Sequence, residues 1–403
     1  MIGSILERVA ALPADLRGIF ESIFYVDVSA GRAIPPPPME PWVIRQFGSV
    51  EAVREQTIVN ITNRLTLESA LFNPLRARRP SQGATDDAAL EAWIARDLAE
   101  HDIFRDPERD TTADVFGRIR GRYCVTASNV AKYEGWHGLV IFDEPHPLRF
   151  GPAQVADYLD TALRWIAAAH AQDPAAIYPA ITWNCLPKSG ATIMHGHMQV
   201  ALAHGMPYAR TELWRRAMAS YRAGTGRGYF DDLLALHDAL GLAIPHAGHA
   251  RIVAHLTPLR NREIVFLAGL PQDTAPYPAD TPYPADTEEP PYRALYGGSS
   301  VSAPVSAPVS APAGPLFESI ALTLRRLIDT QGMRAFNLAI ALPPVGPAAE
   351  EWAAMPIVAR VGDRGNPLSE RSDIGAMELF AAGCITADPF EVAAALRQAP
   401  DHT

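Results

Sequence analysis

The stretch Ile193-Met194-His195-Gly196-His197-Met198-Gln199-Val200-Ala201-Leu202 decides how the rest of the chain is interpreted. Side chains in a strand alternate between two faces, so this stretch predicts a strand with one polar and one apolar face. The polar face carries Ile193, His195, His197 and Gln199, and the apolar face carries Met194, Met198, Val200 and Leu202. Buried polar groups cost free energy unless they are hydrogen-bonded or functional. Gly196 adds no side chain, so another group is expected to approach the backbone closely there.

Two histidines and a glutamine on one strand face suit the chemistry of phosphate attack. An imidazole can act as nucleophile or base, and a glutamine amide can donate to an anionic oxygen without a charge to titrate. Attack by His197 would give a covalent intermediate, while His195 would hold that ring, bind a phosphate or bind a metal. The strand alone leaves two alternatives open, a histidine pair satisfied by hydrogen bonds and an H-x-H metal pair.

Composition limits the class of protein. The chain has 403 residues, 48% hydrophobic and 20% charged, which is enough for a large core in two domains or two fused halves. A net charge of −10 argues against nonspecific binding of nucleic acid, which needs a basic surface, so no nucleic-acid partner is expected.

Cysteine usage and hydropathy indicate the compartment. The three cysteines are far apart and form no C-x-x-C, which is typical of a reducing compartment without a disulfide framework. The chain has no run of 18 apolar residues, so we expect no membrane span and no membrane partner. Charged residues interrupt the first 24 positions, which argues against a signal peptide. The expected location is cytoplasmic.

A basic turn follows a predicted hairpin in the first hundred residues. Residues 61–74 read as two short strands around a turn, and Arg76, Arg78 and Arg79 follow. A solvated basic turn is one interpretation. A phosphate clamp is the other, because guanidinium groups pair bidentately with phosphate oxygens.

Asn184, a turn of small residues and H-x-H-x-Q together resemble the galactose-1-phosphate uridylyltransferase-like branch of the histidine-triad (HIT) superfamily. The resemblance implies that His197 is the nucleotidylated nucleophile, that His195 supports it and that Gln199 contacts the transferred phosphate. It also places Asn184 and the turn residues near the phosphates or the nucleotide; these are Ser189, Gly190, Ala191 and Thr192. The run at 189–192 is also similar to the dinucleoside polyphosphate phosphorylases of this branch.

Further motifs occur in the order of the same family. Arg76 and Arg79 match the two arginines of an R-A-x-R-P turn that holds nucleotide phosphates in uridylyltransferases. Asn129 resembles the family residue that lines the nucleoside pocket, which makes it a ribose or base candidate. His146 resembles a histidine that reaches the family's zinc, but the usual cysteine pair is absent. No metal and no cofactor are therefore expected.

The resemblance runs from about residue 60 to residue 397 and implies an α+β fold. Two HIT-like halves, each an antiparallel sheet with packed helices, would be fused in one chain. We expect an N-terminal helical extension at 1–50, a first half with the transfer motif at 51–205, and a second half at 206–403. The second half contains a low-complexity insertion at 271–314 with repeated Pro and Ser, which cannot build a core.

The implied function is transfer of a nucleoside monophosphate from a nucleoside-diphosphate sugar or related nucleotide to a phosphorylated acceptor, through a nucleotidyl-histidine. The second half lacks the family's H-x-H strand near the sugar. A phosphorylase or hydrolase of nucleotide sugars or dinucleoside polyphosphates is therefore an alternative, as is a non-catalytic nucleotide-binding protein. The expected partner is a nucleotide or nucleotide-sugar substrate, and a homodimer is possible.

Overall fold

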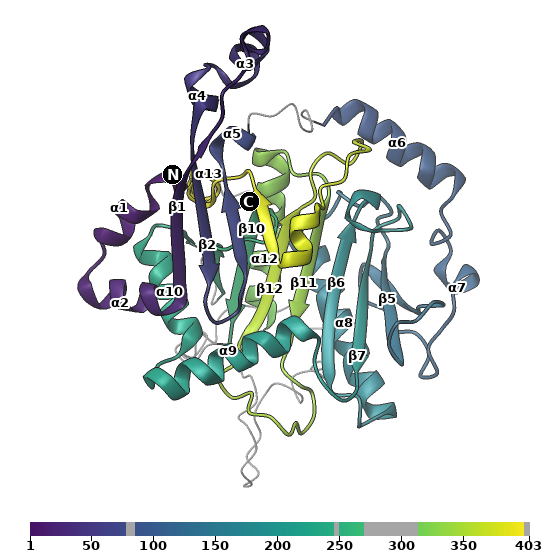
Figure 1. The fold of residues 1–403 in the computed structure, drawn as a ribbon. Coiled ribbons are helices and arrows are strands. Elements are labelled where there is room, and N and C mark those ends of the chain that lie inside the picture. Colours follow the sequence, from purple (N-terminus) through teal and green to yellow (C-terminus); the bar gives the residue numbers. More distant parts are fainter. Residues whose placement is uncertain (78–84, 246–249, 270–312, 399–403) are drawn as a thin grey trace.

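The computed structural model describes residues 1–77, 85–245, 250–269 and 313–398. These ranges form a nine-stranded antiparallel sheet, a four-stranded sheet and packed helices (Figure 1). The α+β class with two sheet-and-helix halves, predicted from the sequence, is confirmed. Most of the expected insertion at 271–314 lies outside the described residues.

The nine-stranded sheet runs through both halves of the chain. Its strands, in spatial order, are β4 (Cys124–Ser128), β5 (Trp136–Phe142), β7 (His197–Ala203), β6 (Tyr178–Cys185), β11 (Phe336–Ala341), β12 (Ile357–Asp363), β10 (Asn261–Ala268), β9 (Arg251–Ala254) and β8 (Ala243–Ile244). β6 pairs with β11 from Cys185 opposite Phe336 to Ala180 opposite Ala341. The halves therefore share one continuous sheet.

Helices α8 (Pro152–Gln172) and α12 (Ala313–Gln331) cover the back face of this sheet and contact each other. The apolar residues of α8 recur with the helical period and are buried, as the sequence predicted. Phe142 of β5 stacks on Tyr158 of α8 with ring centroids 3.7 Å apart, and Trp183 of β6 meets the Phe142 ring edge-on. The back face is thus the main core.

The front face is covered at its two sides and open at its centre. Phe104 packs over β4 and β5, and helix α9 (Ala209–Thr225) places Trp214 over Arg360 of β12. Between these covers, Thr182 and Gln199 are half-buried and Ala339 is exposed. Small side chains at the centre of a sheet leave room for a ligand, so this open strip of β7, β6 and β11 is where a site can form.

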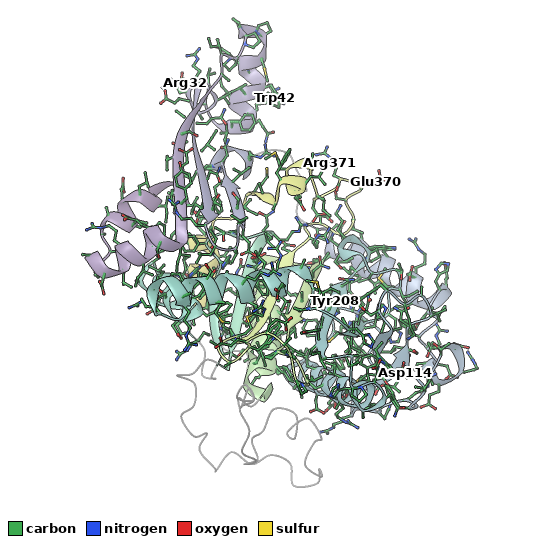
Figure 2. All side chains as sticks on the ribbon, turned by 60° about the horizontal axis from the view of Figure 1, so that its bottom comes forward. Arg32, Trp42, Asp114, Tyr208, Glu370 and Arg371 are labelled. Carbon is green, nitrogen blue, oxygen red and sulfur yellow. The ribbon has the colours of Figure 1, made fainter. Side chains whose placement is uncertain are left out.

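The four-stranded sheet is made of β1 (Phe24–Arg32), β2 (Glu55–Asn63), β3 (Ser69–Phe72) and β13 (Ala382–Ile385). β2 and β3 form the hairpin that the sequence predicted, and β13 adds to β3 in parallel. Segment 1–50 contains α1 (Ile5–Ala10), α2 (Ala14–Ile23) and α3 (Glu40–Phe47), but β1 pairs with β2 along its whole length. The expected helical extension is therefore partly strand. Figure 2 shows Trp42 near the tip of the projection that this segment forms.

The remaining described helices are short or lie at the periphery. They are α4 (Glu51–Arg54), α5 (Pro74–Ala77), α6 (Asp87–Glu100), α7 (Pro107–Asp110), α10 (Tyr229–Ala239), α13 (Pro389–Gln398) and the 3-10 turns η1 (Ile2–Ser4), η2 (Pro37–Met39), η3 (Pro187–Ser189) and η5 (Ala376–Phe380). In the described ranges, no helix has the length and apolar character that a bilayer crossing requires.

A buried ion pair joins the β2–β3 turn to the second half. The guanidinium of Arg360 donates to both carboxylate oxygens of Glu68, at 2.8 and 3.0 Å, and Arg210 donates to the same carboxylate. Burial opposes ionisation of Glu68, but the neighbouring cations, Arg360 above all, outweigh it and hold the pKa of Glu68 at about 2. Removing one partner of such a pair is costly, so this contact fixes the hairpin against the large sheet.

Candidate active site

Strand β7 begins at His197, and residues 192–195 form a bend before it. The predicted strand was therefore too long at its start, and His195 lies just outside it. The bend is held because Gly196 N–H donates to Pro145 O at 2.9 Å and Gly196 O accepts from Phe142 N–H at 3.0 Å. A Cβ at Gly196 would lie 2.6 Å from Cδ2 of Phe142. The group expected to approach this glycine closely is thus the Phe142 ring.

His197 is held so that one ring nitrogen is free. Its side chain is buried, and Nδ1 lies 2.8 Å from the backbone oxygen of His195. A carbonyl oxygen only accepts, so Nδ1 carries the proton and Nε2 keeps its lone pair. No hydrogen bond joins Nε2 to any residue in the part of the chain that the structure describes. Burial lowers the pKa of His197, which favours the neutral and nucleophilic ring.

His195 is fixed on both sides. Its Nδ1 lies 2.9 and 3.1 Å from the carboxylate oxygens of Asp102, and its Nε2 lies 2.7 Å from Phe142 O. The edge-to-face ring of Phe104 contacts both His195 and His197. A hydrogen-bonded structural histidine therefore describes His195 well. That bonding positions the backbone oxygen which orients His197.

The residues present do not fit the zinc that the resemblance implies. Nδ1 of His146 accepts from Leu148 N–H at 3.3 Å, and its Nε2 lies 3.2 Å from a carboxylate oxygen of Glu91. Burial lowers the pKa of His146, against the opposing charge of Glu91. No cluster of three or more His, Cys, Asp or Glu suited to a metal ion occurs in the described ranges.

The structure brings Gln199 and Asn129 together through a residue that sequence analysis missed. Gln199 Oε1 lies 3.0 Å from Nε2 of His137, and Asn129 Nδ2 lies 3.2 Å from the same nitrogen. β5 pairs with β7 so that Leu139 lies opposite Gln199 and His137 opposite Ala201. His137 thus shares the face of Gln199 and His197. The only sign of this in the sequence is that His137 lies two residues before Leu139, so that both side chains point to the same face of the strand.

Asn184 lies on β6 and is half-buried. Its Oδ1 accepts from Nδ2 of Asn337 at 2.7 Å, so its own amide hydrogens remain available. The register that places Thr182 opposite Gln199 would, if continued, place Asn184 beside His197. The second half therefore reaches the site through Asn337.

The predicted phosphate-binding turn at 189–192 is held mainly by hydrogen bonds to the residues just before it. The Ser189 hydroxyl is buried and shares its one hydrogen between the backbone oxygens of Cys185 and Leu186, which lie 2.6 and 2.7 Å away. Gly190 has a φ of +98°, which favours glycine, and beyond it Ala191 is buried and Thr192 exposed. Ser189 therefore stabilises the turn.

A loop of the second half is tied onto this turn. Lys188 Nζ donates to Ser369 O at 2.8 Å and to Arg371 O. Figure 2 shows Glu370 and Arg371 on the surface of that loop. Arg364, at the start of the loop, pairs with Asp373 and donates from Nη1 to Asn337 Oδ1 at 2.7 Å. Hydrogen bonds thus hold the turn at 189–192 against the second half of the chain.

The arginine pair is placed only in part. Arg76 lies in α5, is half-buried, and has no side-chain hydrogen bond or ion pair with any described residue. Arg79 lies outside the described residues. No described contact connects Arg76 with His197, so both arginines stay predicted phosphate ligands.

Comparisons with known proteins support the fold. No family model and no curated protein sequence matches this chain. The solved ADP-glucose phosphorylase of Arabidopsis thaliana with bound ADP-glucose has a TM-score of 0.58 at 14% identity, covering 84% of this chain and 98% of that one. A GalT-like protein from Arabidopsis thaliana has a TM-score of 0.54 at 15% sequence identity, covering 74% of this chain and 91% of that one. A uridylyltransferase has a TM-score of 0.51 at 12% sequence identity, covering 71% of this chain and 87% of that one. Identities this low show a shared fold.

Proposed function

We propose that this chain, which shares the fold of the galactose-1-phosphate uridylyltransferase-like branch of the HIT superfamily, transfers a nucleoside monophosphate through a covalent intermediate on Nε2 of His197. The observation that carries the proposal is the bond from His197 Nδ1 to His195 O. It leaves Nε2 as the nucleophilic atom of a buried, neutral ring.

The reaction would proceed in two displacements. His197 Nε2 attacks the α-phosphorus of a nucleoside-diphosphate sugar, and the bond from that phosphorus to the bridging oxygen breaks. The sugar phosphate leaves with the bonding electron pair, and the ring becomes cationic while its proton stays on Nδ1, hydrogen-bonded to His195 O. A phosphate oxygen of the acceptor then attacks the phosphorus. The P–N bond breaks and the neutral ring is restored.

Charge neutralisation and positioning would supply most of the catalysis, as in phosphoryl transfer generally. The side-chain amides of Gln199 and Asn184 are neutral donors on the open strip beside His197. Arg76 and Arg79 would add positive charge for the phosphates of the nucleotide.

The acceptor distinguishes the variants of this function. If the acceptor is a sugar phosphate, the protein is a transferase. If the acceptor is inorganic phosphate, it is a phosphorylase, and if the acceptor is water, it is a hydrolase. The phosphorylase is the second candidate, because an ADP-glucose phosphorylase is among the similar structures and covers 84% of this chain. A dinucleoside polyphosphate is a further donor to test.

Intact-mass spectrometry tests the proposal. The protein is incubated separately with UDP-glucose, ADP-glucose, GDP-mannose and diadenosine tetraphosphate, and an adduct of one nucleoside monophosphate is expected with one of them. Adding glucose 1-phosphate, inorganic phosphate or buffer alone to the adduct then identifies the acceptor. The absence of both adduct and nucleotide exchange with all four donors would refute the proposed chemistry.

A further inference from the structure

We propose that His137 and Asn337 are positioning residues that fix which end of the Gln199 and Asn184 amides faces the substrate. An amide presents either an NH2 donor or an oxygen acceptor, and only the donor attracts a phosphate. The proposal rests on the function proposed above. It adds two residues, one from each half, that decide whether these amides present a hydrogen-bond donor or an acceptor to the substrate.

The first relay begins at the backbone N–H of Tyr133. It lies 3.4 Å from Nδ1 of His137 and can only donate, so Nδ1 is the acceptor and Nε2 carries the proton. Nε2–H then donates to Gln199 Oε1 at 3.0 Å. The NH2 group of Gln199 is thereby turned away from His137 and left available to a ligand.

Each tautomer of His137 sets one ring N–H against another donor, and the first relay uses the tautomer that keeps the bond to Gln199 Oε1. A proton on Nε2 faces the Asn129 NH2, 3.2 Å away, whereas a proton on Nδ1 faces the N–H of Tyr133 and leaves Gln199 Oε1 without a donor. Asn129 Oδ1 accepts from Ala131 N–H at 3.1 Å, which accounts for its orientation. Burial lowers the pKa of His137, which favours the neutral ring.

His137 itself is held firmly. Its side chain is 1% exposed, and its backbone oxygen accepts from Asn129 N–H and from Lys132 Nζ, both at 2.9 Å. The ring of Tyr133 lies against it, with centroids 3.8 Å apart. A ring confined in this way cannot turn over to present its other nitrogen.

The second relay begins at the guanidinium of Arg364, which has donors only. Arg364 is anchored by Asp373 and donates to Asn337 Oδ1 at 2.7 Å, so the Asn337 NH2 must point the other way. That NH2 donates to Asn184 Oδ1 at 2.7 Å and to Ser189 O at 2.8 Å. The NH2 of Asn184 is left for a ligand.

Both relays therefore start at a group that can only donate and end at an amide NH2 on the open strip beside His197. Preorganised donors that need no reorientation during the reaction are a large part of electrostatic catalysis. Flipping either amide would replace a donor with an oxygen facing an anion. We expect the effect to fall on kcat for nucleotidyl-His197 formation more than on KM.

The first test needs no substrate. In protein labelled with 15N-histidine, the imidazole nitrogen shifts of His137, assigned by comparison with His137→Phe, report its tautomer. We expect a protonated Nε2 and an unprotonated Nδ1. A protonated Nδ1 would overturn the first relay, whatever the protein does to nucleotides.

The second test measures labelling of His197 by ADP-glucose and UDP-glucose. His137→Phe and Asn337→Asp should each lower kcat on the order of 100-fold. His137→Gln keeps a donor for Gln199 and should recover most of the loss. His204→Ala, at an exposed ion pair, and Asn60→Asp, which keeps an acceptor for Ser69, are matched controls expected to leave kcat unchanged.

Two results would overturn the positioning role. One is wild-type kcat in a folded His137→Phe or Asn337→Asp protein, and the other is an equal loss in His137→Gln and His137→Phe. Failure of the wild-type protein to be labelled by any nucleotide would instead refute the proposed function. The tautomer measurement then decides the first relay by itself.

Discussion

The backbone oxygen of His195 accepts a hydrogen bond from Nδ1 of His197 at 2.8 Å, while the His195 ring is itself hydrogen-bonded to Asp102 and Phe142. Two histidines that look equivalent in the H-x-H pattern therefore have different environments. One has both ring nitrogens satisfied and the other has Nε2 free, which separates a supporting residue from a nucleophile.

His197→Gly should abolish the nucleotide adduct and leave a cooperatively folded protein. The substitution removes Nε2, whereas the backbone oxygen of His195 and the pairing of β7 do not depend on the ring. Intact mass after incubation with nucleotide and a circular dichroism melt measure the two effects. An adduct formed by the variant at the wild-type rate would show that the nucleophile is another residue.

Arg76→Ala and Arg79→Ala should each weaken nucleotide binding by roughly 1.5–3 kcal/mol, the value of a charge-assisted hydrogen bond. Arg76 has no ion pair with a described residue, so its melting temperature without ligand should barely change. Isothermal titration with the nucleotide that labels His197 measures the affinity. Unchanged affinity in both variants would return this cluster to a solvated basic turn.

Gly196→Ala should destabilise the protein by about 1–3 kcal/mol, the usual cost of overpacking. The added Cβ would lie 2.6 Å from Phe142, and that ring cannot retreat because it stacks on Tyr158. Urea unfolding gives the free-energy difference. Gly3→Ala is the matched control, since its Cβ would meet nothing within 4 Å. Equal stability of the two variants would contradict the predicted clash.

The free energy of unfolding should fall as the pH is lowered from about 6.5 towards 4. Burial lowers the pKa of His237 from 6.5 to about 4, so in this window the unfolded chain binds a proton that the folded chain does not. Its Nε2 must stay unprotonated to accept from Leu256 N–H at 3.1 Å. The slope from this residue is at most about 1.4 kcal/mol per pH unit.

Urea unfolding at several pH values measures that slope. His237→Phe should be less stable at pH 7 and should show a smaller slope between pH 6.5 and 4. The exposed His204 provides the control, because His204→Ala should keep the wild-type slope. An undiminished slope in His237→Phe would show that other groups account for the acid sensitivity.

Much of the fold could be predicted because local patterns were strong. The buried face of α8 repeats with the helical period, and the β2–β3 hairpin has a clear turn between two short strands. β1 was missed because it follows α2 without a break and most of its side chains are exposed on both faces. β13 was missed because it is short and its partner β3 is distant in sequence, which no local pattern can reveal.

The candidate site could likewise be predicted from the sequence only in part. His197 and Gln199 share one face of β7, as the alternation in the sequence predicted. His137 and Asn337 were not predicted, because their importance depends on strand pairings that bring β5 and β11 to the two sides of the β7–β6 pair. Sequence order sets which residues share a strand face, whereas the register between strands decides which faces meet.

The parallel pairing of β3 with β13 has a consequence for protein synthesis. β3 leaves the ribosome early, but of the described strands β13 is made last. A nascent chain must therefore carry β3 as an unpaired strand edge while the large sheet is still being translated, and such edges are prone to wrong association. The bond from Ile2 N–H to the carboxylate of Asp388 closes the same region. The small sheet can therefore be completed only after the chain has been synthesised through β13.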